Sequence, residues 1–312
     1  MIGSHTARLL VDSGKRPIIL EISPQHEAIN NIVNLKQVEL SLRSILNYED
    51  VYQLVKTKEI NKIVHTVANP LLNAGAQEKP LDATTLNVIG TANILEVARK
   101  LDLDRVVFLS SATLYTNLKG GSEFGKLSED HLPRTTNIYT TTKLACENLG
   151  LNYVELYGID FVALRPVGVF GPWSGQGGGG RSNMMRRIIE NISQGKEAFI
   201  SPWVGELVYV KDVANAIQLA LRGKKLKRRV YNIGMGKIYS PQEIISIFAQ
   251  LVAGAEVKID SSSETMLKFK PTWEAERPID LTRSKSELSY EPSYDMPKAI
   301  GDYIDWNKKG TR

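Results

Sequence analysis

The stretch RVVFLSSATLY, residues 105–115, and the stretch YTTTK, residues 139–143, decide how this chain is interpreted. The first begins as a continuous apolar run, which is typical of a strand buried on both faces of a parallel sheet, and it ends in serines and small residues. In the second, Tyr139 and Lys143 have helical spacing and share one helix face. Ser111, at the strand end, can then lie beside the Tyr139 phenol and the Lys143 ammonium, so that the three groups converge on one ligand oxygen.

The three side chains have the chemistry of a proton-exchange site. A lysine ammonium beside a phenol favours the phenolate, so we expect Lys143 to lower the pKa of Tyr139 from its reference value of about 10. Tyr139 would then exchange a proton near neutral pH, while Ser111 hydrogen-bonds to the reacting oxygen. Tyr-x-x-x-Lys by itself is also the pattern of an ordinary surface pair on a helix. The serine-bearing strand end before it, and the strands and helices on both sides, favour an active site.

Strands and helices alternate outward from this stretch. Strands are predicted at residues 17–22, 62–68, 105–110, 161–166, 207–210 and 230–233, and helices near 1–13, 48–58, 85–100, from 139, 183–194, from 211, 240–252, 283–288 and 297–306. Successive buried strands joined by helices cannot be hairpins, so the sequence predicts an α/β fold with a doubly wound, Rossmann-type parallel sheet. Residues 1–166 are predicted to form the dinucleotide-binding domain, and 167–312 a smaller substrate or lid domain interleaved with the last sheet elements.

Two strand ends carry features of a dinucleotide site. Glu21 ends the strand predicted at 17–22, where a carboxylate can accept hydrogen bonds from the adenosine ribose and repel a 2′-phosphate. We therefore expect NAD rather than NADP. Val67 and Ala68 end the next strand with small side chains, which allow a flat cofactor to approach the backbone.

Residues 168–180 contain seven glycines. So many glycines make a flexible loop rather than packed core. Two interpretations stay open, a loop that closes over a substrate and a disordered segment.

Composition excludes several classes of function. The net charge of +5 is modest, and the densest basic run, 222–229, falls where a solvated loop is expected, so no nucleic-acid partner is predicted. A single cysteine, Cys146, excludes an internal disulfide and suits a reducing cytosol, which makes a cytoplasmic protein the expectation. No long apolar run or leader pattern indicates a membrane segment, and no ligand-like spacing of His and Cys indicates a metal. His65 is expected in the core.

The ordered matches along the chain closely resemble the extended short-chain dehydrogenase/reductase superfamily, and within it the NAD-dependent epimerase/dehydratase family of UDP-galactose 4-epimerase. The matching stretches are residues 2–5, 63–68, 87–91, 110–115, 139–143, 165–166, 170–172, 208–212 and 280–288. The resemblance implies NAD as the cofactor, a sugar or nucleotide-sugar substrate, and a homodimer through the helices 85–100 and 139–153. It also implies hydride transfer between a carbinol carbon and NAD, with return to the opposite face in an epimerase.

The same resemblance implies roles by position. Ser111 and Tyr139 would contact the reacting hydroxyl or carbonyl, and Lys143 the nicotinamide ribose. The implied cofactor contacts are Gly3, Glu21, Ser44, Ile45, Val67, Ala68, Asn87, Tyr139, Lys143 and Pro166. The implied substrate contacts are Ser111, Thr113, Gly168 and Arg277, with Arg181 and Arg186 as further anion partners or solvated surface residues.

The chain departs from the family pattern at several positions. Of the Gly-x-x-Gly-x-x-Gly phosphate loop only the last glycine, Gly3, is present, so we expect either a sequence that begins inside a longer protein or a relative with impaired NAD binding. Where the family has an asparagine and an arginine that contact the substrate diphosphate, this chain has Gly168 and Gly205. The dehydratases of the family carry two acidic residues at the positions of Ala112 and Thr113, so their absence here disfavours dehydration. The acidic residue that faces the adenine in the family is replaced by Ser44.

The leading prediction is an NAD-dependent epimerase or oxidoreductase acting on a sugar or nucleotide-sugar. The glycines at the two diphosphate positions keep open a dehydrogenase or reductase of a smaller carbonyl compound. The incomplete phosphate loop keeps open a nucleotide-binding paralogue with impaired catalysis.

Overall fold

The computed structural model describes residues 1–68, 76–115, 125–223, 226–262 and 277–309. Its central element is a four-stranded parallel sheet in the order β3-β4-β5-β9. The strands are β3 (Lys62–His65), β4 (Arg105–Leu109), β5 (Phe161–Pro166) and β9 (Val230–Ile233). The predicted α/β fold with a parallel, Rossmann-type sheet is confirmed.

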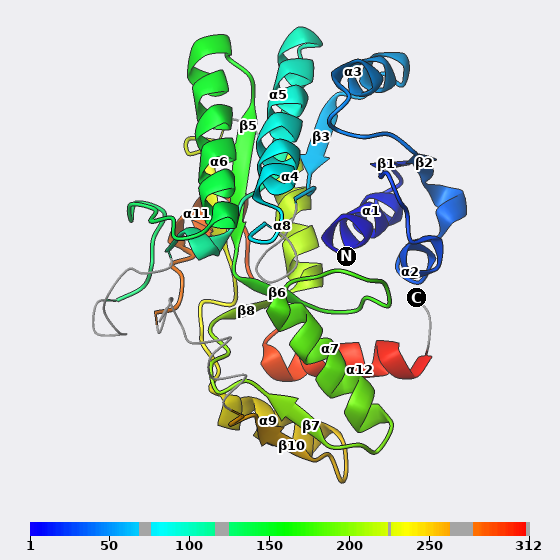
Figure 1. The fold of residues 1–312 in the computed structure, drawn as a ribbon, viewed down its shortest axis with the longest axis vertical. Coiled ribbons are helices and arrows are strands. Elements are labelled where there is room, and N and C mark those ends of the chain that lie inside the picture. The colour runs from blue at the N-terminus through cyan, green and yellow to red at the C-terminus, as the bar shows by residue number, and fades with distance from the viewer. Residues whose placement is uncertain (69–75, 116–124, 224–225, 263–276, 310–312) are drawn as a thin grey trace.

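Helices cover both faces of this sheet because its strands are apolar on both sides. In β4, Val107 and Leu109 belong to one apolar cluster and Val106 and Phe108 to another, as the two-residue repeat of a strand requires. The helices of the first face are α1 (Ile2–Asp12), α8 (Val210–Arg222) and α11 (Thr282–Leu288), and those of the second are α3 (Tyr48–Thr57), α5 (Gly90–Lys100) and α6 (Ile138–Tyr157). Figure 1 shows α5 and α6 standing side by side over the sheet.

The sheet is interrupted between its first strands. β1 (Ile18–Leu20) pairs in parallel with β2 (Glu39–Ser41), and within the described residues this pair is not hydrogen-bonded to β3. Two short helices, α2 (His26–Asn30) and α4 (Pro80–Thr84), lie in the connections around it.

A smaller assembly follows β5 and occupies the lower part of Figure 1. Its strands form two further parallel pairs, β6 (Gly168–Phe170) with β8 (Leu207–Tyr209) and β7 (Ala198–Ile200) with β10 (Val257–Ile259). Its helices are α7 (Gly180–Ser193), α9 (Pro241–Leu251) and α12 (Met296–Lys309), which share one apolar cluster with these strands. The chain returns to the main sheet through α8 and β9. The division at residues 166 and 167 stays a prediction.

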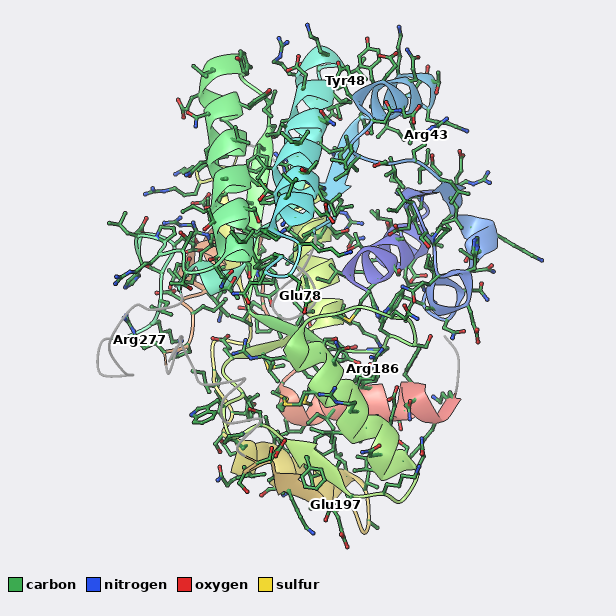
Figure 2. The ribbon with its side chains drawn as sticks, in the orientation of Figure 1. Arg43, Tyr48, Glu78, Arg186, Glu197 and Arg277 are labelled. Carbon is green, nitrogen blue, oxygen red and sulfur yellow. The ribbon has the colours of Figure 1, made fainter. Side chains whose placement is uncertain are left out.

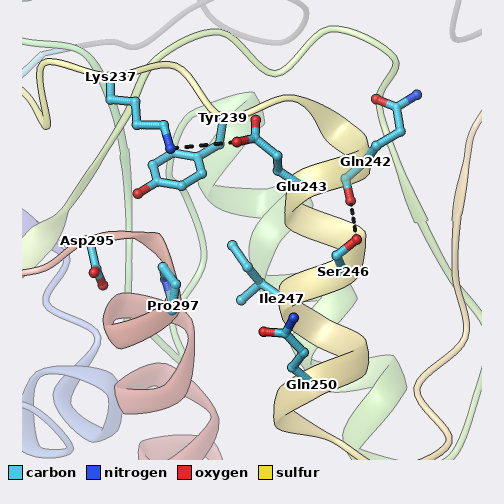
Figure 3. Close-up of a pocket in the computed structure, with 9 residues that line it drawn as sticks. All are labelled: Lys237, Tyr239, Gln242, Glu243, Ser246, Ile247, Gln250, Asp295 and Pro297. Atoms are coloured by element: carbon cyan, nitrogen blue, oxygen red, sulfur yellow. Dashed lines mark hydrogen bonds and ion pairs between the residues drawn. The ribbon is translucent and has the colours of Figure 1, made fainter.

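One pocket among the described residues lies in this smaller assembly, between α9 and the start of α12. Figure 3 shows its polar lining, including an ion pair between Lys237 and Glu243 and the hydrogen bond from Ser246 to the carbonyl of Gln242. Its volume is about 500 Å³, and its lining contains none of the predicted site residues.

Among the described residues, no helix combines the length and the apolar character needed to cross a membrane. The same residues contain no group of three or more His, Cys, Asp or Glu side chains arranged to hold a metal ion.

Candidate active site

Tyr139 and Lys143 lie in the first two turns of α6, and the sequence before them fixes where this helix begins. Asn137 accepts a hydrogen bond from the Thr140 backbone N–H, and Thr140 completes the capping box with its side chain. The helix ends at Gly158, whose φ of 72° is the left-handed conformation that glycine adopts at little cost. Both ends of the helix that carries the two residues are therefore specified locally.

Ser111 meets Tyr139 directly after β4. The Tyr139 hydroxyl is hydrogen-bonded to Ser111. The Ser111 Oγ also accepts hydrogen bonds from the hydroxyl of Thr113 at 2.8 Å and from its backbone N–H at 3.2 Å. Because Thr113 supplies two donors, it orients the Ser111 hydroxyl. The structure thus brings Ser111, Thr113, Tyr139 and Lys143 together at the carboxyl end of the sheet.

The electrostatics of Tyr139 differ from the prediction. We expected Lys143 to lower the pKa of Tyr139, but burial raises this pKa to about 12, and only the hydrogen bond with Ser111 opposes the rise. The Lys143 Nζ lies 5.8 Å from the Tyr139 ring centroid and donates a hydrogen bond to the carbonyl of Leu109 at 2.5 Å. The ammonium is directed at a backbone oxygen rather than at the phenol, so Tyr139 holds its proton at neutral pH.

Burial also affects Lys143, since it lowers the pKa of this side chain to about 8. The folded chain therefore binds this proton less tightly than the unfolded chain, whose lysine pKa is about 10.4. Stability is reduced while both states are protonated, below about pH 8, and it recovers as the pH rises through the interval between the two pKa values.

Lys143→Met is therefore expected to raise the free energy of unfolding at pH 7 by about 1–3 kcal/mol, because it removes a desolvated charge from a buried site. Urea unfolding at pH 7 and at pH 10 measures the effect, and the gain should be much smaller at pH 10. Lys36→Met, at an exposed lysine, is the control and should leave stability nearly unchanged. A variant less stable than wild type at pH 7 would contradict the assigned cost of burial.

The sequence analysis missed a buried polar network behind these residues. Glu147, one turn beyond Lys143 on α6, forms an ion pair with Arg165 of β5, and both are nearly inaccessible, 1% and 4% exposed. Ser110 donates a hydrogen bond to Glu147 at 2.8 Å, and Arg165 donates one to the Tyr115 hydroxyl at 2.7 Å. The spacing of 139, 143 and 147 on one helix face was the available signal.

The residues predicted to bind the adenosine part and the pyrophosphate of the cofactor lie on or beside the small β1–β2 sheet. Glu21 follows β1 and is exposed, and its carboxylate accepts a hydrogen bond from the Ile22 N–H at 2.9 Å. Gly3 lies in the first turn of α1, where a Cβ atom would come within 3.3 Å of the Thr66 hydroxyl. The N-terminal end of α1 has no side-chain cap. An exposed carboxylate and an uncapped helix end beside a glycine suit a ribose and a phosphate respectively.

Several other residues predicted to contact the cofactor have structural partners. The Asn87 side-chain amide donates a hydrogen bond to Thr142 at 2.9 Å, which connects it to the residue before Lys143. Ile45 is buried against Gly90, whose missing side chain makes room for it. Ser44 accepts a hydrogen bond from the backbone of Leu46. Of the remaining predicted residues, Pro166 ends β5, whereas Val67 and Ala68 follow β3, which ends at His65 rather than at the predicted residue 68.

The predicted substrate residues are dispersed. Arg277 donates a hydrogen bond to the carbonyl of Gly125 at 2.7 Å and also contacts the His131 ring, so it holds the segment 125–131 in place. Arg186 on α7 donates one to the carbonyl of Gly175 at 2.7 Å. Figure 2 shows these two arginines well apart. Gly168 opens β6, just beyond β5.

The glycine-rich stretch 168–180 is tied to the N-terminal half of the chain, which corrects the alternative of a disordered segment. Trp173 is buried in a cluster with residues of α1 and α2. Gln25 and the backbone of Gln176 exchange two hydrogen bonds, one in each direction. His5 makes a 2.9 Å hydrogen bond with the carbonyl of Pro172, and burial lowers the pKa of His5 to about 4, which leaves it neutral.

Known proteins are similar to this chain over nearly its whole length. The sequence model of the NAD dependent epimerase/dehydratase family matches residues 1–234. UDP-glucose 4-epimerase of Halalkalibacterium halodurans is 26% identical over 329 residues, a match that covers 99% of this chain and 93% of that protein.

Two solved structures have the same fold. UDP-glucose 4-epimerase of Thermus thermophilus, in complex with NAD, has a TM-score of 0.79 at 23% identity and covers 99% of this chain and 96% of its own. A partial consensus L-threonine 3-dehydrogenase has a TM-score of 0.84 at 20% identity, with coverage of 100% and 97%.

Proposed function

Because the chain belongs to the NAD dependent epimerase/dehydratase family, whose members are NAD-dependent enzymes, we propose that it epimerises a hydroxyl-bearing carbon of a nucleotide-sugar. The observation that carries the proposal is the meeting of Ser111, Tyr139 and Lys143 at the carboxyl end of the sheet, where Ser111 acts on the Tyr139 phenol and Lys143 lies one turn further along the same helix. These are the groups that proton exchange at a carbinol or carbonyl oxygen requires.

The residues present fit the cofactor at three places. Glu21 would hold the adenosine ribose, the N-terminal end of α1 beside Gly3 would face the pyrophosphate, and Lys143 with Tyr139 would hold the nicotinamide ribose. The absence of a side chain at Gly3 suits this role, since a Cβ would crowd Thr66. When bound, NAD supplies the exchange of hydride at the substrate carbon.

The protein's own contribution is proton transfer and alignment. Tyr139 is protonated at neutral pH, so it is ready to donate a proton to a carbonyl oxygen of the substrate. Once it has given up that proton, the phenolate accepts the proton of the carbinol in the reverse direction, and the Ser111 hydrogen bond makes this easier because it stabilises the phenolate and so lowers the pKa of the phenol. Thr113 holds Ser111 in place, and neither Thr113 nor Ala112 supplies the acid that dehydration requires.

The experiment incubates the purified protein with NAD and, in separate reactions, UDP-glucose, UDP-N-acetylglucosamine and UDP-glucuronate. We expect NMR to show conversion to the 4-epimer with no net rise in NADH absorbance. NADH fluorescence titration should show tighter binding than NADPH, because Glu21 repels a 2′-phosphate. Absence of both NADH binding and epimerisation would reject the proposal.

A second function is favoured by one observation. Gly168 and Gly205 stand where the family pattern has diphosphate contacts, which suits a smaller carbonyl substrate oxidised or reduced in a single direction. Steady accumulation of NADH with a small hydroxy compound, and no epimerisation of any UDP-sugar, would support this dehydrogenase instead. The homodimer through 85–100 and 139–153 stays a prediction.

A further inference from the structure

The turn that carries Ser111 connects β4 to a short 3₁₀-helix, η3 (Ala112–Tyr115). Ser110 opens this turn and Tyr115 ends it, and both side chains are nearly inaccessible, 3% and 2% exposed. A buried hydroxyl group needs a hydrogen-bond partner, because leaving it unpaired costs free energy. The partners of these two hydroxyls therefore decide how firmly the turn around Ser111 is held.

The two hydroxyls are bonded to the two members of one buried ion pair. Ser110 donates a hydrogen bond to the Glu147 carboxylate at 2.8 Å, and the Tyr115 hydroxyl accepts one from Arg165 at 2.7 Å. Glu147 and Arg165 are paired with each other. Hydrogen bonds to charged groups are stronger than those between neutral groups, and a dry interior strengthens them further. The turn is thus fastened at both of its ends to the same pair of charges.

The ion pair joins this turn to the helix of the catalytic tyrosine. Glu147 follows Lys143 on α6 at the spacing with which Lys143 follows Tyr139, so the three side chains share one helix face. A shift of the turn relative to α6 would break a hydrogen bond to a buried charge, which is costly. The pair therefore keeps the Ser111 turn at a fixed place beside Tyr139.

Tyr115 is also held from its other side. Its hydroxyl donates a hydrogen bond to the side-chain carbonyl of Asn232 in β9 at 2.8 Å, and its ring centroid lies 5.2 Å from the guanidinium carbon of Arg165. Burial raises the pKa of Tyr115 to about 12, so the hydroxyl keeps its proton at neutral pH. Both the donor and the acceptor of this hydroxyl are in use, which fixes its position.

We propose that Tyr115 is a positioning residue for the reaction, because its bond to Arg165 holds the Ser111 hydroxyl in place beside the Tyr139 phenol. Tyr115 acts through Ser111 and is not itself a proton donor to the substrate. This role rests on the proposed function, since the placement of Ser111 affects a rate only if Tyr139 and Ser111 act on the reacting oxygen.

The test uses Tyr115→Phe, which removes the hydroxyl and keeps the ring beside Arg165. The protein is prepared with Cζ-labelled tyrosine, and the NMR signal of Tyr139 is identified by its loss in Tyr139→Phe. Ser111→Ala shows where this signal lies when the serine contact is lost. We expect Tyr115→Phe to move the Tyr139 signal in the same direction as Ser111→Ala.

The kinetic effect should be specific to the chemical step. Tyr115→Phe is expected to lower kcat for UDP-hexose epimerisation by about 10- to 100-fold with little change in KM, as misplacement of a catalytic group does. Because Tyr115 acts through Ser111, the double variant Ser111→Ala/Tyr115→Phe should be no slower than Ser111→Ala alone.

Tyr290→Phe is the matched control. Tyr290 belongs to the same apolar cluster as Tyr115, is fully buried, and donates a hydrogen bond to the carbonyl of Gly234 at 2.9 Å. Its substitution also removes one buried hydroxyl, but at a place outside the Ser111 turn. The control should leave the Tyr139 signal and kcat at their wild-type values.

Three results overturn the proposal: a Tyr139 signal unchanged by Tyr115→Phe, equal effects of Tyr115→Phe and Tyr290→Phe, or a double variant slower than Ser111→Ala by the full Tyr115→Phe factor. If Tyr115→Phe does not fold, Arg165→Lys decides by the same signal, because it keeps a charge opposite Glu147 and removes the planar fork that reaches Tyr115. A wild type that epimerises no UDP-sugar rejects the proposed function, whereas the Tyr139 signal still tests how Ser111 is held.

Discussion

Replacing Tyr139 by phenylalanine is expected to lower kcat by about 10²- to 10⁴-fold, the usual contribution of a positioned general acid or base. The substitution removes only a hydroxyl, which in the structure is hydrogen-bonded to Ser111. Rates of UDP-hexose interconversion, followed by NMR, measure the loss. NADH binding should be largely retained, because the ring and Lys143 remain in place.

The matched control for this prediction is Tyr153→Phe. Tyr153 lies on the same helix, 14 residues or about 21 Å further along it, and its hydroxyl faces Glu96 rather than the active edge. The control should retain wild-type activity. If Tyr139→Phe is as active as wild type while Tyr153→Phe is normal, then Tyr139 does not transfer the proton.

The fold was predictable because its signals are local and repeated. Residues 105–110 form a long apolar run, and β5 occupies the predicted interval 161–166. The short strands β2, β6, β7 and β10 were missed, since three residues cannot display a two-residue alternation convincingly. The strand predicted at 207–210 ends at Tyr209 because α8 begins at Val210.

The site was predictable only in part. Helical spacing was enough to place Tyr139 and Lys143 on one face, but the pKa of Tyr139 depends on burial, which no spacing reveals. Asn87 resembles a cofactor contact in sequence, yet its amide is directed at Thr142. Arg181 comes close to Gly168 and Gly205 only after α7 packs on β6, so its place could not be derived from a strand end.

Lys143 and Glu147 lie on the same face of α6, but their buried charges affect the stability of the fold in opposite ways. Lys143 is a buried cation bonded to a neutral carbonyl, and its removal is expected to stabilise the fold. Glu147 is a buried anion with a full set of partners, namely Arg165 and the hydroxyl of Ser110. Removing one member of such a pair leaves the other charge buried without compensation, and the expected effect is therefore the opposite.

Glu147→Gln is accordingly expected to lower the free energy of unfolding by about 3–5 kcal/mol, because it leaves the Arg165 guanidinium charged inside the protein. The change is nearly isosteric, so no cavity contributes. Urea unfolding at pH 7 measures the loss. Ser110 would also lose its charged acceptor next to Ser111, so we expect lower kcat in the fraction that stays folded.

The double variant Glu147→Gln/Arg165→Met distinguishes charge from shape. Methionine removes the unpaired guanidinium, so the double variant should be more stable than Glu147→Gln alone, although Tyr115 loses its hydrogen-bond donor. If the double variant instead shows the sum of the two single losses, the residues act independently, and α6 is then held on the sheet by its apolar contacts with Phe161 and the rest of that cluster rather than by the buried ion pair.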